Sequence, residues 1–267
     1  MAEVNDTRLY YEVCGTGPTL LFVHGYTLDH RMWSRQVEAL SLRFRTVIYD
    51  CRGFGSSEMP GGQRYSHSYD AAALCQHLGI ERVIPIGHSV GAYHALEFAL
   101  ACPELVAGLV AICPTPPAAV PTGIPFPEEL ERMFAAIGKA ARAGCLDAAK
   151  EIWRRADWFG PARELPVLAA ELDKILSDYS GWDWTHPNPV EYAEPFALDS
   201  LSGLEVPALV VTGGRDLEFN DEVAQVLMKR VPSAIALRLP RAGHMANMED
   251  AAAVNRAIAE FVPLAGL

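Results

Sequence analysis

Long apolar runs and an N-terminal signal pattern are both missing from this sequence of 267 residues. The longest apolar-rich stretch, residues 105–113, is about half of the roughly 20 residues that a membrane-spanning helix needs, so it predicts a core strand. The first residues include acids, where a signal peptide needs a basic start followed by an apolar stretch. We therefore expect no secretion signal and no membrane segment, and a soluble, cytoplasmic protein.

Basic clusters and paired cysteines are missing as well. The 22 Lys and Arg residues stand against 33 Asp and Glu residues, so the net charge is −11, with no basic run to offset it. A phosphate backbone or an anionic membrane would repel such a protein. The 6 cysteines are scattered without a CxxC pair or a metal-type spacing, which predicts buried free thiols. We expect no metal, no cofactor and no nucleic-acid partner, but a small-molecule substrate and a monomer or homodimer.

Short, nearly continuous apolar runs alternate with helical patterns along much of the chain. Strands with little polar alternation are covered on both faces, so the sequence predicts a parallel sheet of the α/β class with helices on both sides. The predicted strands are residues 19–23, 45–49, 82–86, 106–112, 208–212 and 235–239. The predicted helices between them are residues 31–42, 69–78, 90–101, 221–230 and 249–261. Residues 4–13 predict a leading antiparallel hairpin.

One long segment interrupts this alternation. After residue 114 the chain has a proline-rich entry and then helical patterns at residues 128–143, 147–156 and 164–177, with no convincing strand. The pattern predicts a helical cap at residues 115–199, inserted into an α/β core of residues 1–114 and 200–267. The cap ends in an aromatic stretch, in which we expect Trp182 and Trp184 to form a wall of the substrate pocket.

The sequence GHSVG at residues 87–91 is the strongest local signal of chemistry. It follows an apolar strand and precedes a helical segment, which is the context that a G-x-S-x-G nucleophile turn requires. Ser89 would sit on a tight corner, where Gly87 and Gly91 let backbones approach closely. An ordinary strand-to-helix turn could carry the same five letters, so the assignment depends on partners elsewhere.

A serine hydroxyl is a weak nucleophile and needs a base, which in turn needs an orienting carboxylate. His244 is the best-placed base, because it follows the last predicted strand and a glycine. Asp216 ends the preceding strand segment and is the predicted acid. Glu218 and Asp221 remain alternatives, although both lie deeper in the following loop or at a helix start, where an Asp more often acts as a cap.

A tetrahedral intermediate also needs two backbone N–H donors for its oxyanion. One should come from Val90, the residue after the nucleophile, and the second from Tyr26, in the turn after the strand at residues 19–23. We expect His24 to brace this turn by hydrogen bonding; a role for it as the catalytic base is the alternative. The substrate is expected to contact Tyr26, His88 and Met245, next to these groups.

With Ser89, Asp216 and His244 in this order, the sequence resembles the α/β-hydrolase superfamily over nearly its whole length. Two further motifs carry the resemblance: YDCRGFGSS at residues 49–57, similar to the D-x-R-G-x-G-x-S loop after strand four, and GHMANME at residues 243–249. The resemblance implies an eight-stranded, mostly parallel sheet with a helical cap after strand six. A serine at position 89 argues against the haloalkane dehalogenases and epoxide hydrolases, whose nucleophile is a carboxylate.

The group that looks most similar contains 3-oxoadipate enol-lactonases, carbon–carbon bond hydrolases, arylesterases and cofactor-free perhydrolases. The resemblance therefore implies a serine hydrolase that cleaves an ester, a lactone or a vinylogous diketone of a small, mainly apolar substrate through an acyl-enzyme on Ser89. We expect a carboxylic ester hydrolase or lactonase ahead of a carbon–carbon bond hydrolase. The alternative is a signalling receptor or regulator on the same scaffold, which binds a small ligand and turns it over slowly or not at all.

Overall fold

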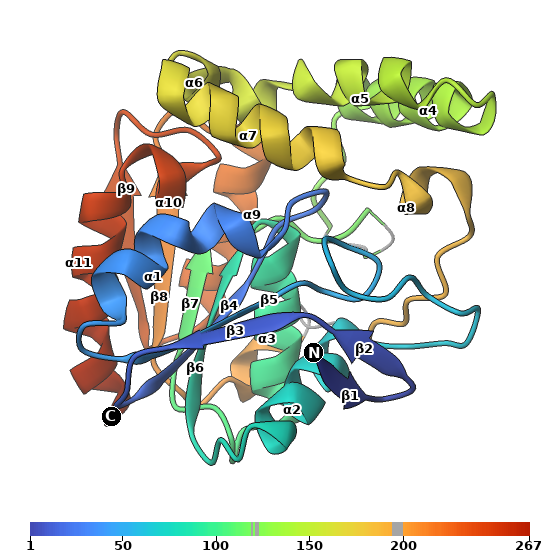
Figure 1. Cartoon of the computed structure of the whole chain (residues 1–267). Coiled ribbons are helices and arrows are strands. Elements are labelled where there is room, and N and C mark those ends of the chain that lie inside the picture. Colours follow the sequence, from blue (N-terminus) through green and yellow to red (C-terminus); the bar gives the residue numbers. More distant parts are fainter. Residues whose placement is uncertain (119, 121–122, 194–199) are drawn as a thin grey trace.

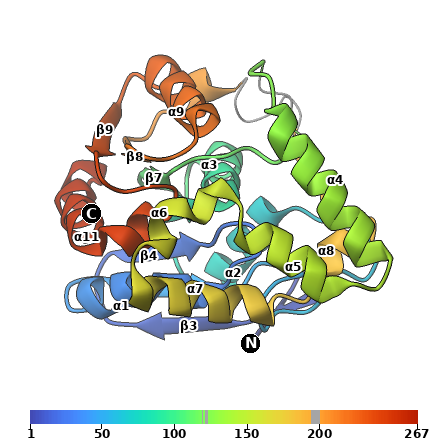
Figure 2. The ribbon, with the colours of Figure 1, turned by 90° about the horizontal axis from the view of Figure 1, so that it is seen from above.

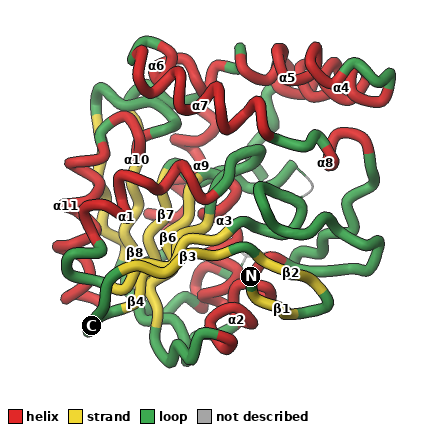
Figure 3. The backbone as a smooth tube through the Cα atoms, in the orientation of Figure 1, coloured by secondary structure: helices red, strands yellow, loops and turns green. Residues whose placement is uncertain are grey.

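Seven strands form the main sheet of the computed structural model, in the order β3-β5-β4-β6-β7-β8-β9 (Figures 1 and 3). The structure describes residues 1–118, 120, 123–193 and 200–267. Neighbouring strands are parallel except β3, which pairs antiparallel with β5. The strands are β3 Tyr11–Cys14, β4 Thr19–Val23, β5 Arg45–Tyr49, β6 Val83–His88, β7 Leu109–Ile112, β8 Ala208–Gly213 and β9 Ala234–Leu239. The predicted parallel α/β sheet is thereby confirmed.

Helices cover both faces of this sheet. In Figure 2, α1 and α11 lie on one side of the strands and α2, α3 and α9 on the other. Every residue of β4 and of β6 is buried, which explains why these strands read as continuous apolar runs. Each large side chain of this kind, such as Phe22, stabilises the fold by roughly 1.5–3 kcal/mol through burial. The core helices are α1 Ser34–Leu40, α2 His67–His77, α3 Val90–Ala101, α9 Glu218–Arg230, α10 Ala246–Glu249 and α11 Ala251–Phe261, with 3₁₀ turns η1 His30–Trp33, η3 Leu201–Gly203 and η4 Val262–Ala265.

The leading segment differs from the expectation of eight strands in one sheet. β1 (Ala2–Val4) and β2 (Thr7–Leu9) pair only with each other, so the described residues give seven strands in the main sheet and a separate two-stranded hairpin. Asn5 and Asp6 both have positive φ, at 47° and 57°, which closes this hairpin with a two-residue turn. The chain then passes through Tyr10 into β3, which alone of the three leading strands joins the main sheet.

Five helices and a 3₁₀ turn, which we call the cap helices, lie between β7 and β8 in the chain and above the sheet in Figure 1. They are α4 Glu128–Arg142, α5 Leu146–Arg154, η2 Asp157–Phe159, α6 Gly160–Arg163, α7 Pro166–Asp178 and α8 Trp182–Thr185, all within residues 115–199. The buried indole of Trp153 donates a hydrogen bond of 2.6 Å to the Thr27 hydroxyl. Ion pairs of Arg31 with Asp178 at 2.7 Å and of Arg35 with Glu171 at 2.6 Å add further links between the cap helices and the core.

The longest described helix, α4, has 15 residues and an acidic first turn. A helix needs about 20 mostly apolar residues to cross a bilayer. Within the part of the chain that the structure describes, no helix has both the length and the apolar character for this.

Candidate active site

Ser89 lies at the sharp corner between β6 and α3. Its backbone adopts φ 55° and ψ −125°, an unusual conformation for a residue with a side chain. A Cβ on Gly87 would approach the carbonyl oxygen of Gly91 to 2.2 Å, and one on Gly91 would approach the carbonyl oxygen of Val23 to 2.3 Å. The two glycines therefore allow the corner that directs the Ser89 hydroxyl toward the carboxyl edge of the sheet.

The structure brings Ser89, His244 and Asp216 into one hydrogen-bonded chain. The Nε2 atom of His244 lies 2.9 Å from the Oγ atom of Ser89. The Nδ1 atom of His244 lies 2.9 and 3.0 Å from the two carboxylate oxygens of Asp216. His244 follows β9 and Asp216 follows β8, so neighbouring parallel strands deliver both groups to the same edge of the sheet.

The charge of Asp216 fixes the direction of these hydrogen bonds. Burial raises the pKa of this carboxyl, but the nearby His244 and hydrogen bonds from His244, Asn220 and the Leu217 amide outweigh it, so the pKa is lowered overall. The ionised carboxylate accepts from Nδ1–H of His244, which leaves the Nε2 lone pair to accept from the Ser89 hydroxyl. The arrangement can therefore remove a proton from Ser89.

The alternative acids lie elsewhere. Asp221 pairs with Arg238 at 3.0 Å, and the Glu218 side chain is exposed at the start of α9. Among the described residues, Asp216 is the carboxylate that hydrogen-bonds His244.

Two supporting residues were missed by sequence reasoning. The Asn220 amide donates to Asp216 at 2.8 Å and accepts from the Thr115 hydroxyl at 2.9 Å, so it holds the acid in place. Glu249 accepts from the backbone N–H groups on both sides of His244, Gly243 at 2.5 Å and Met245 at 3.2 Å. Glu249 was visible as the last residue of GHMANME, and Asn220 lies four residues after Asp216, near the start of α9, so both had a signal in the sequence.

His88 joins the nucleophile strand to the loop that carries the base. Its Nε2–H donates to the backbone carbonyl of His244 at 2.8 Å. Burial, with the nearby His244 as a further cause, lowers the pKa of His88 to about 3, so the ring is neutral. The His88 side chain therefore fixes the backbone of His244 next to Ser89, in addition to the direct hydrogen bond between the side chains of Ser89 and His244.

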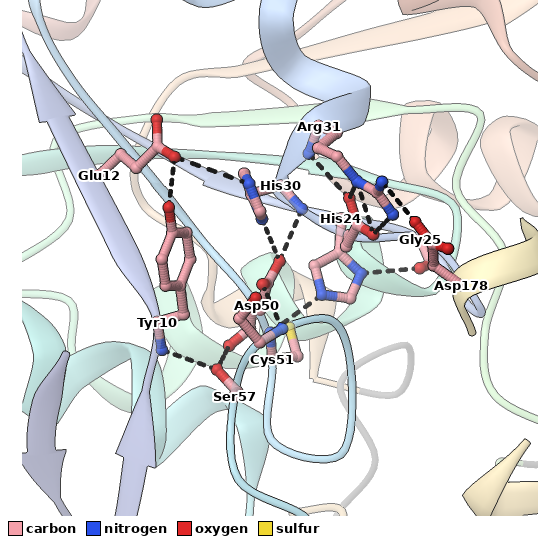
Figure 4. Close-up of polar contacts among 12 residues, drawn as sticks. Tyr10, Glu12, His24, Gly25, His30, Arg31, Asp50, Cys51, Ser57 and Asp178 are labelled. Atoms are coloured by element: carbon pink, nitrogen blue, oxygen red, sulfur yellow. Dashed lines mark hydrogen bonds and ion pairs between the residues drawn. The ribbon is translucent and has the colours of Figure 1, made fainter. Parts of the chain in front are cut away.

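The turn after β4 is braced by His24. Its Nδ1–H donates to the carbonyl of Gly25 at 2.8 Å, and its Nε2 accepts from the Cys51 amide at 2.9 Å, as Figure 4 shows. Figure 4 also shows the neighbouring network around Asp50, whose carboxylate accepts from the His30 ring at 2.8 Å. Both ring nitrogens of His24 are thus occupied by backbone groups, as a bracing role requires.

The amides of Tyr26 and Val90 face no competing backbone acceptor. Within the described part of the chain neither N–H donates to a backbone carbonyl, and Val90 is the first residue of α3, where helical N–H groups have no intrahelical partner. Both residues line the cavity beside Ser89. Both amides therefore lie beside Ser89 without a backbone acceptor among the described residues.

A cavity of about 360 Å³ opens beside Ser89 and His244. The cap helices and the segment that leads to them supply aromatic rings to its wall: Phe126, Phe134, Trp153, Trp158 and Phe159. The Trp158 ring lies 6.1 Å from the His244 ring, between centroids. Tyr26, His88 and Met245 also line the cavity, as expected of substrate contacts.

The prediction that Trp182 and Trp184 form a wall of the substrate pocket is wrong, because neither belongs to the described lining of this cavity. Trp182 stacks on His186 with centroids 5.0 Å apart, and the buried Trp184 packs against Tyr179 at 4.9 Å. In the short helix α8, successive side chains point about 100° apart. The residue between the two tryptophans, Asp183, is the one that lines the cavity.

Among the described residues, two groups of three side chains have the residue types of metal ligands: Cys113, Asp216 and His244 in one, and Asp29, His30 and Asp50 in the other. Within each group, the donor atoms lie within 4.8 Å of one another. In the first group, His244 bonds both Asp216 and Ser89. In the second, Asp29 pairs with Arg31 at 2.6 Å and Asp50 accepts from His30. Hydrogen bonds and ion pairs within the chain account for both groups.

The chain matches the family model described as the alpha/beta hydrolase fold over residues 18–251. It is 27% identical to a 2-hydroxy-6-oxononadienedioate/2-hydroxy-6-oxononatrienedioate hydrolase of Pseudomonas putida, over 96% of this chain and 92% of the relative. The enol-lactonase from Burkholderia xenovorans LB400 has a TM-score of 0.81 at 26% identity, covering 98% of this chain and 99% of that one. A thermophilic esterase from Thermogutta terrifontis has a TM-score of 0.80 at 27% identity, covering 97% and 94%. The resemblance seen in the motifs is confirmed, and the chain belongs to the α/β-hydrolase family.

Proposed function

We propose that this hydrolase cleaves the ester or lactone bond of a small, mainly apolar substrate through an acyl-enzyme on Ser89. The observation that carries the proposal is the hydrogen-bonded chain from Ser89 through His244 to Asp216, with Nε2 of His244 2.9 Å from Oγ of Ser89 beside a cavity. These groups in this order suit acyl transfer to a serine.

In the proposed reaction, Oγ of Ser89 attacks the acyl carbon while Nε2 of His244 takes the hydroxyl proton. The bond from the acyl carbon to the leaving oxygen then breaks, and His244 returns the proton to that oxygen. Water attacks the acyl-enzyme with His244 again as base, which releases a carboxylic acid and restores the Ser89 hydroxyl. In a lactone the leaving oxygen stays attached, so the product is a hydroxy acid.

The negative charge that develops on the carbonyl oxygen in each step would be held by the amides of Tyr26 and Val90. Each such donor contributes on the order of 3 kcal/mol to transition-state stabilisation in comparable sites. The first turn of α3, behind Val90, adds a favourable helix dipole.

The aromatic wall from Phe126 to Phe159 supports an apolar acyl or alcohol group in the substrate. Carbon–carbon bond hydrolysis of a vinylogous diketone is a second candidate. It is supported by the Pseudomonas putida relative, which matches nearly the whole chain and is named as a hydrolase of a 2-hydroxy-6-oxo dienedioate.

The test is Ser89→Ala, assayed on p-nitrophenyl esters of increasing acyl length, lactones and a ring-cleavage diketone. We expect the variant to keep the melting temperature of the wild type and to lose about 10⁴-fold or more in kcat. Ser233→Ala, at an exposed serine, serves as the matched control. A fluorophosphonate should label Ser89 in the wild type, as read by peptide mass spectrometry.

Retention of activity in Ser89→Ala, or labelling at another residue, would contradict the acyl-enzyme. A diketone hydrolysed faster than every ester and lactone would select the second candidate.

A further inference from the structure

The cavity beside Ser89 has one carboxyl group and neither lysine nor arginine in its described lining. This carboxyl group belongs to Asp183, on α8. The sequence at positions 119, 121–122 and 194–199, which lie outside the described residues, contains no Lys or Arg either. A negatively charged group in this cavity therefore has no lysine or arginine to pair with.

Asp183 is held in place by hydrogen-bond donors. The Nδ2 atom of Asn188 donates to Oδ1 of Asp183 at 2.5 Å. The orientation of the Asn188 amide is fixed because its oxygen accepts from the Tyr65 hydroxyl at 3.0 Å and from the Val190 amide at 3.2 Å. Burial raises the pKa of the Asp183 carboxyl, hydrogen bonds from Tyr26 and Asn188 lower it, and the net result is a raised pKa.

Two of the histidines that line the cavity, His67 and His94, do not supply a free positive charge. Burial lowers the pKa of His67 well below its usual value, and the neighbouring His94 lowers it further, so this ring is neutral. His94 faces Glu97 at 3.7 Å, so that any charge on it is balanced by that carboxylate. In the described part of the chain, Asp183 forms no ion pair.

Two arginines, Arg52 and Arg64, form ion pairs with carboxylates other than Asp183. Arg52 donates to both carboxylate oxygens of Asp70, at 2.8 and 2.9 Å. Arg64 pairs with Glu191 at 2.6 Å, with both side chains exposed. Among the described residues, no lysine or arginine therefore pairs with the Asp183 carboxyl, which lines the cavity.

We propose that Asp183 is a specificity-determining residue, which selects substrates that carry a hydroxyl or ammonium group at this end of the cavity and rejects substrates that carry a carboxylate there. The inference rests on the proposed ester or lactone hydrolysis and names its substrate class. A hydroxyl group can donate to a carboxylate oxygen of Asp183, and an ammonium group is attracted by the opposite charge of the carboxylate. A carboxylate would face a like charge in a buried site, where such repulsion is weakly screened, or would need to take up a proton.

Tyr26 makes this selection relevant to catalysis. Its backbone amide is one of the two proposed oxyanion donors, and its phenol interacts with Asp183. The Asp183 carboxyl is therefore separated from the reacting carbonyl by the side chain of Tyr26. A substrate carboxylate that Asp183 repels would displace the ester from the oxyanion donors. Rejection should appear in kcat as well as in KM.

Two series of esters test the proposal, because the selected group could belong to either half of the substrate. The acyl series is p-nitrophenyl pentanoate, mono-p-nitrophenyl glutarate and p-nitrophenyl 4-(trimethylammonio)butanoate. The alcohol series is methyl 4-acetoxybenzoate, 4-acetoxybenzoate and 4-(trimethylammonio)phenyl acetate. Comparing each variant with the wild type on the same compound cancels the intrinsic reactivity of the ester.

In at least one series we expect the wild type to have a kcat/KM about 30-fold or more lower for the carboxylate than for the neutral ester. Relative to the neutral ester, Asp183→Asn should raise kcat/KM for that carboxylate about tenfold and lower kcat/KM for the cation about tenfold. Asp157→Asn is the matched control, because it removes the same charge from an exposed site on the cap helices and should change none of these ratios. Asp183→Ser replaces the first variant if it does not fold.

Equal rates for the carboxylate and the neutral ester, or unchanged ratios in Asp183→Asn, would overturn the proposal. If no ester is hydrolysed, the inference is tested by binding; the proposed function fails only if no lactone is hydrolysed either. For this, tryptophan fluorescence of Ser89→Ala would be titrated with 4-phenylbutanol, 4-phenylbutylammonium and 4-phenylbutanoate. Tighter binding of the carboxylate than of the alcohol and the ammonium would refute charge selection, and weaker binding, relieved by Asp183→Asn, would support it.

Discussion

Asp216→Asn should stop turnover while leaving the protein folded. In the wild type, Oδ1 of Asp216 accepts from the Leu217 amide at 2.7 Å and from Asn220 at 2.8 Å, while Oδ2 accepts from Nδ1–H of His244 at 2.9 Å. The asparagine oxygen would take the place of Oδ1, because two donors converge there. The new NH₂ group would then occupy the place of Oδ2 and point a donor at His244.

This reversal forces the other tautomer of His244. Nδ1 would have to accept from the new amide, so the proton would move to Nε2, which then has no lone pair for the Ser89 hydroxyl. The loss of a correctly oriented base in a serine triad lowers kcat by about 10⁴-fold in comparable enzymes, which corresponds to about 5.5 kcal/mol of activation free energy. The local hydrogen bonds are retained in number, so the free energy of unfolding should change by about 2 kcal/mol or less.

The assay is kcat on p-nitrophenyl butyrate, together with the melting temperature. Asp221→Asn is the control, since Asp221 was the alternative acid and pairs with Arg238 instead. Retention of more than about a tenth of the wild-type kcat in Asp216→Asn, or an equal loss in Asp221→Asn, would refute the reasoning about the tautomer.

Two further predictions concern stability. The pKa of His88 is about 3 in the fold against 6.5 for the free side chain, so between these pH values the unfolded chain binds one more proton than the folded chain. The free energy of unfolding should therefore fall as the pH drops from 6.5 toward 3, by up to about 1.4 kcal/mol per pH unit. In denaturant titrations at several pH values, His88→Gln should show a shallower dependence of this free energy on pH. A Cβ on Gly87 would lie 2.2 Å from the Gly91 carbonyl oxygen, so Gly87→Ala should lower the free energy of unfolding by about 3 kcal/mol or more. In the control Gly160→Ala, where no atom lies within 4 Å of the new Cβ, the free energy of unfolding should stay within about 0.5 kcal/mol of the wild type. Similar melting temperatures for the two variants would contradict the strained corner.

The sequence was informative where a local pattern decides the structure. Continuous apolar runs predicted the parallel strands, because strands covered on both faces exclude polar residues. Ser89 was found because a nucleophile corner needs glycines two positions away on each side. His244 and Asp216 were found because the carboxyl ends of parallel strands meet at one edge.

The directions of side chains in short helices and the pairing of distant strands could not be predicted from local sequence patterns. The four-residue helix α8 turns Asp183 toward the cavity and the two tryptophans away, and the phase of so short a helix is set by tertiary packing. β1 and β2 pair only with each other, while β3 pairs with β5, more than thirty residues later in the chain. Glu249 belongs to the GHMANME motif, but the hydrogen bonds that it accepts from the amides of Gly243 and Met245 depend on the tertiary structure.

The candidate catalytic residues and the aromatic wall of the cavity come from different stretches of the chain, which has a practical consequence for protein engineering. Every member of the Ser89, His244 and Asp216 chain is attached to a strand end of the core, whereas the aromatic wall and Asp183 come from residues 115–199. The proposed bond cleavage and the proposed recognition by the aromatic wall and Asp183 therefore depend on separate stretches of the chain. Exchanging the inserted stretch for that of another family member should transfer substrate preference while the chemistry stays with the host.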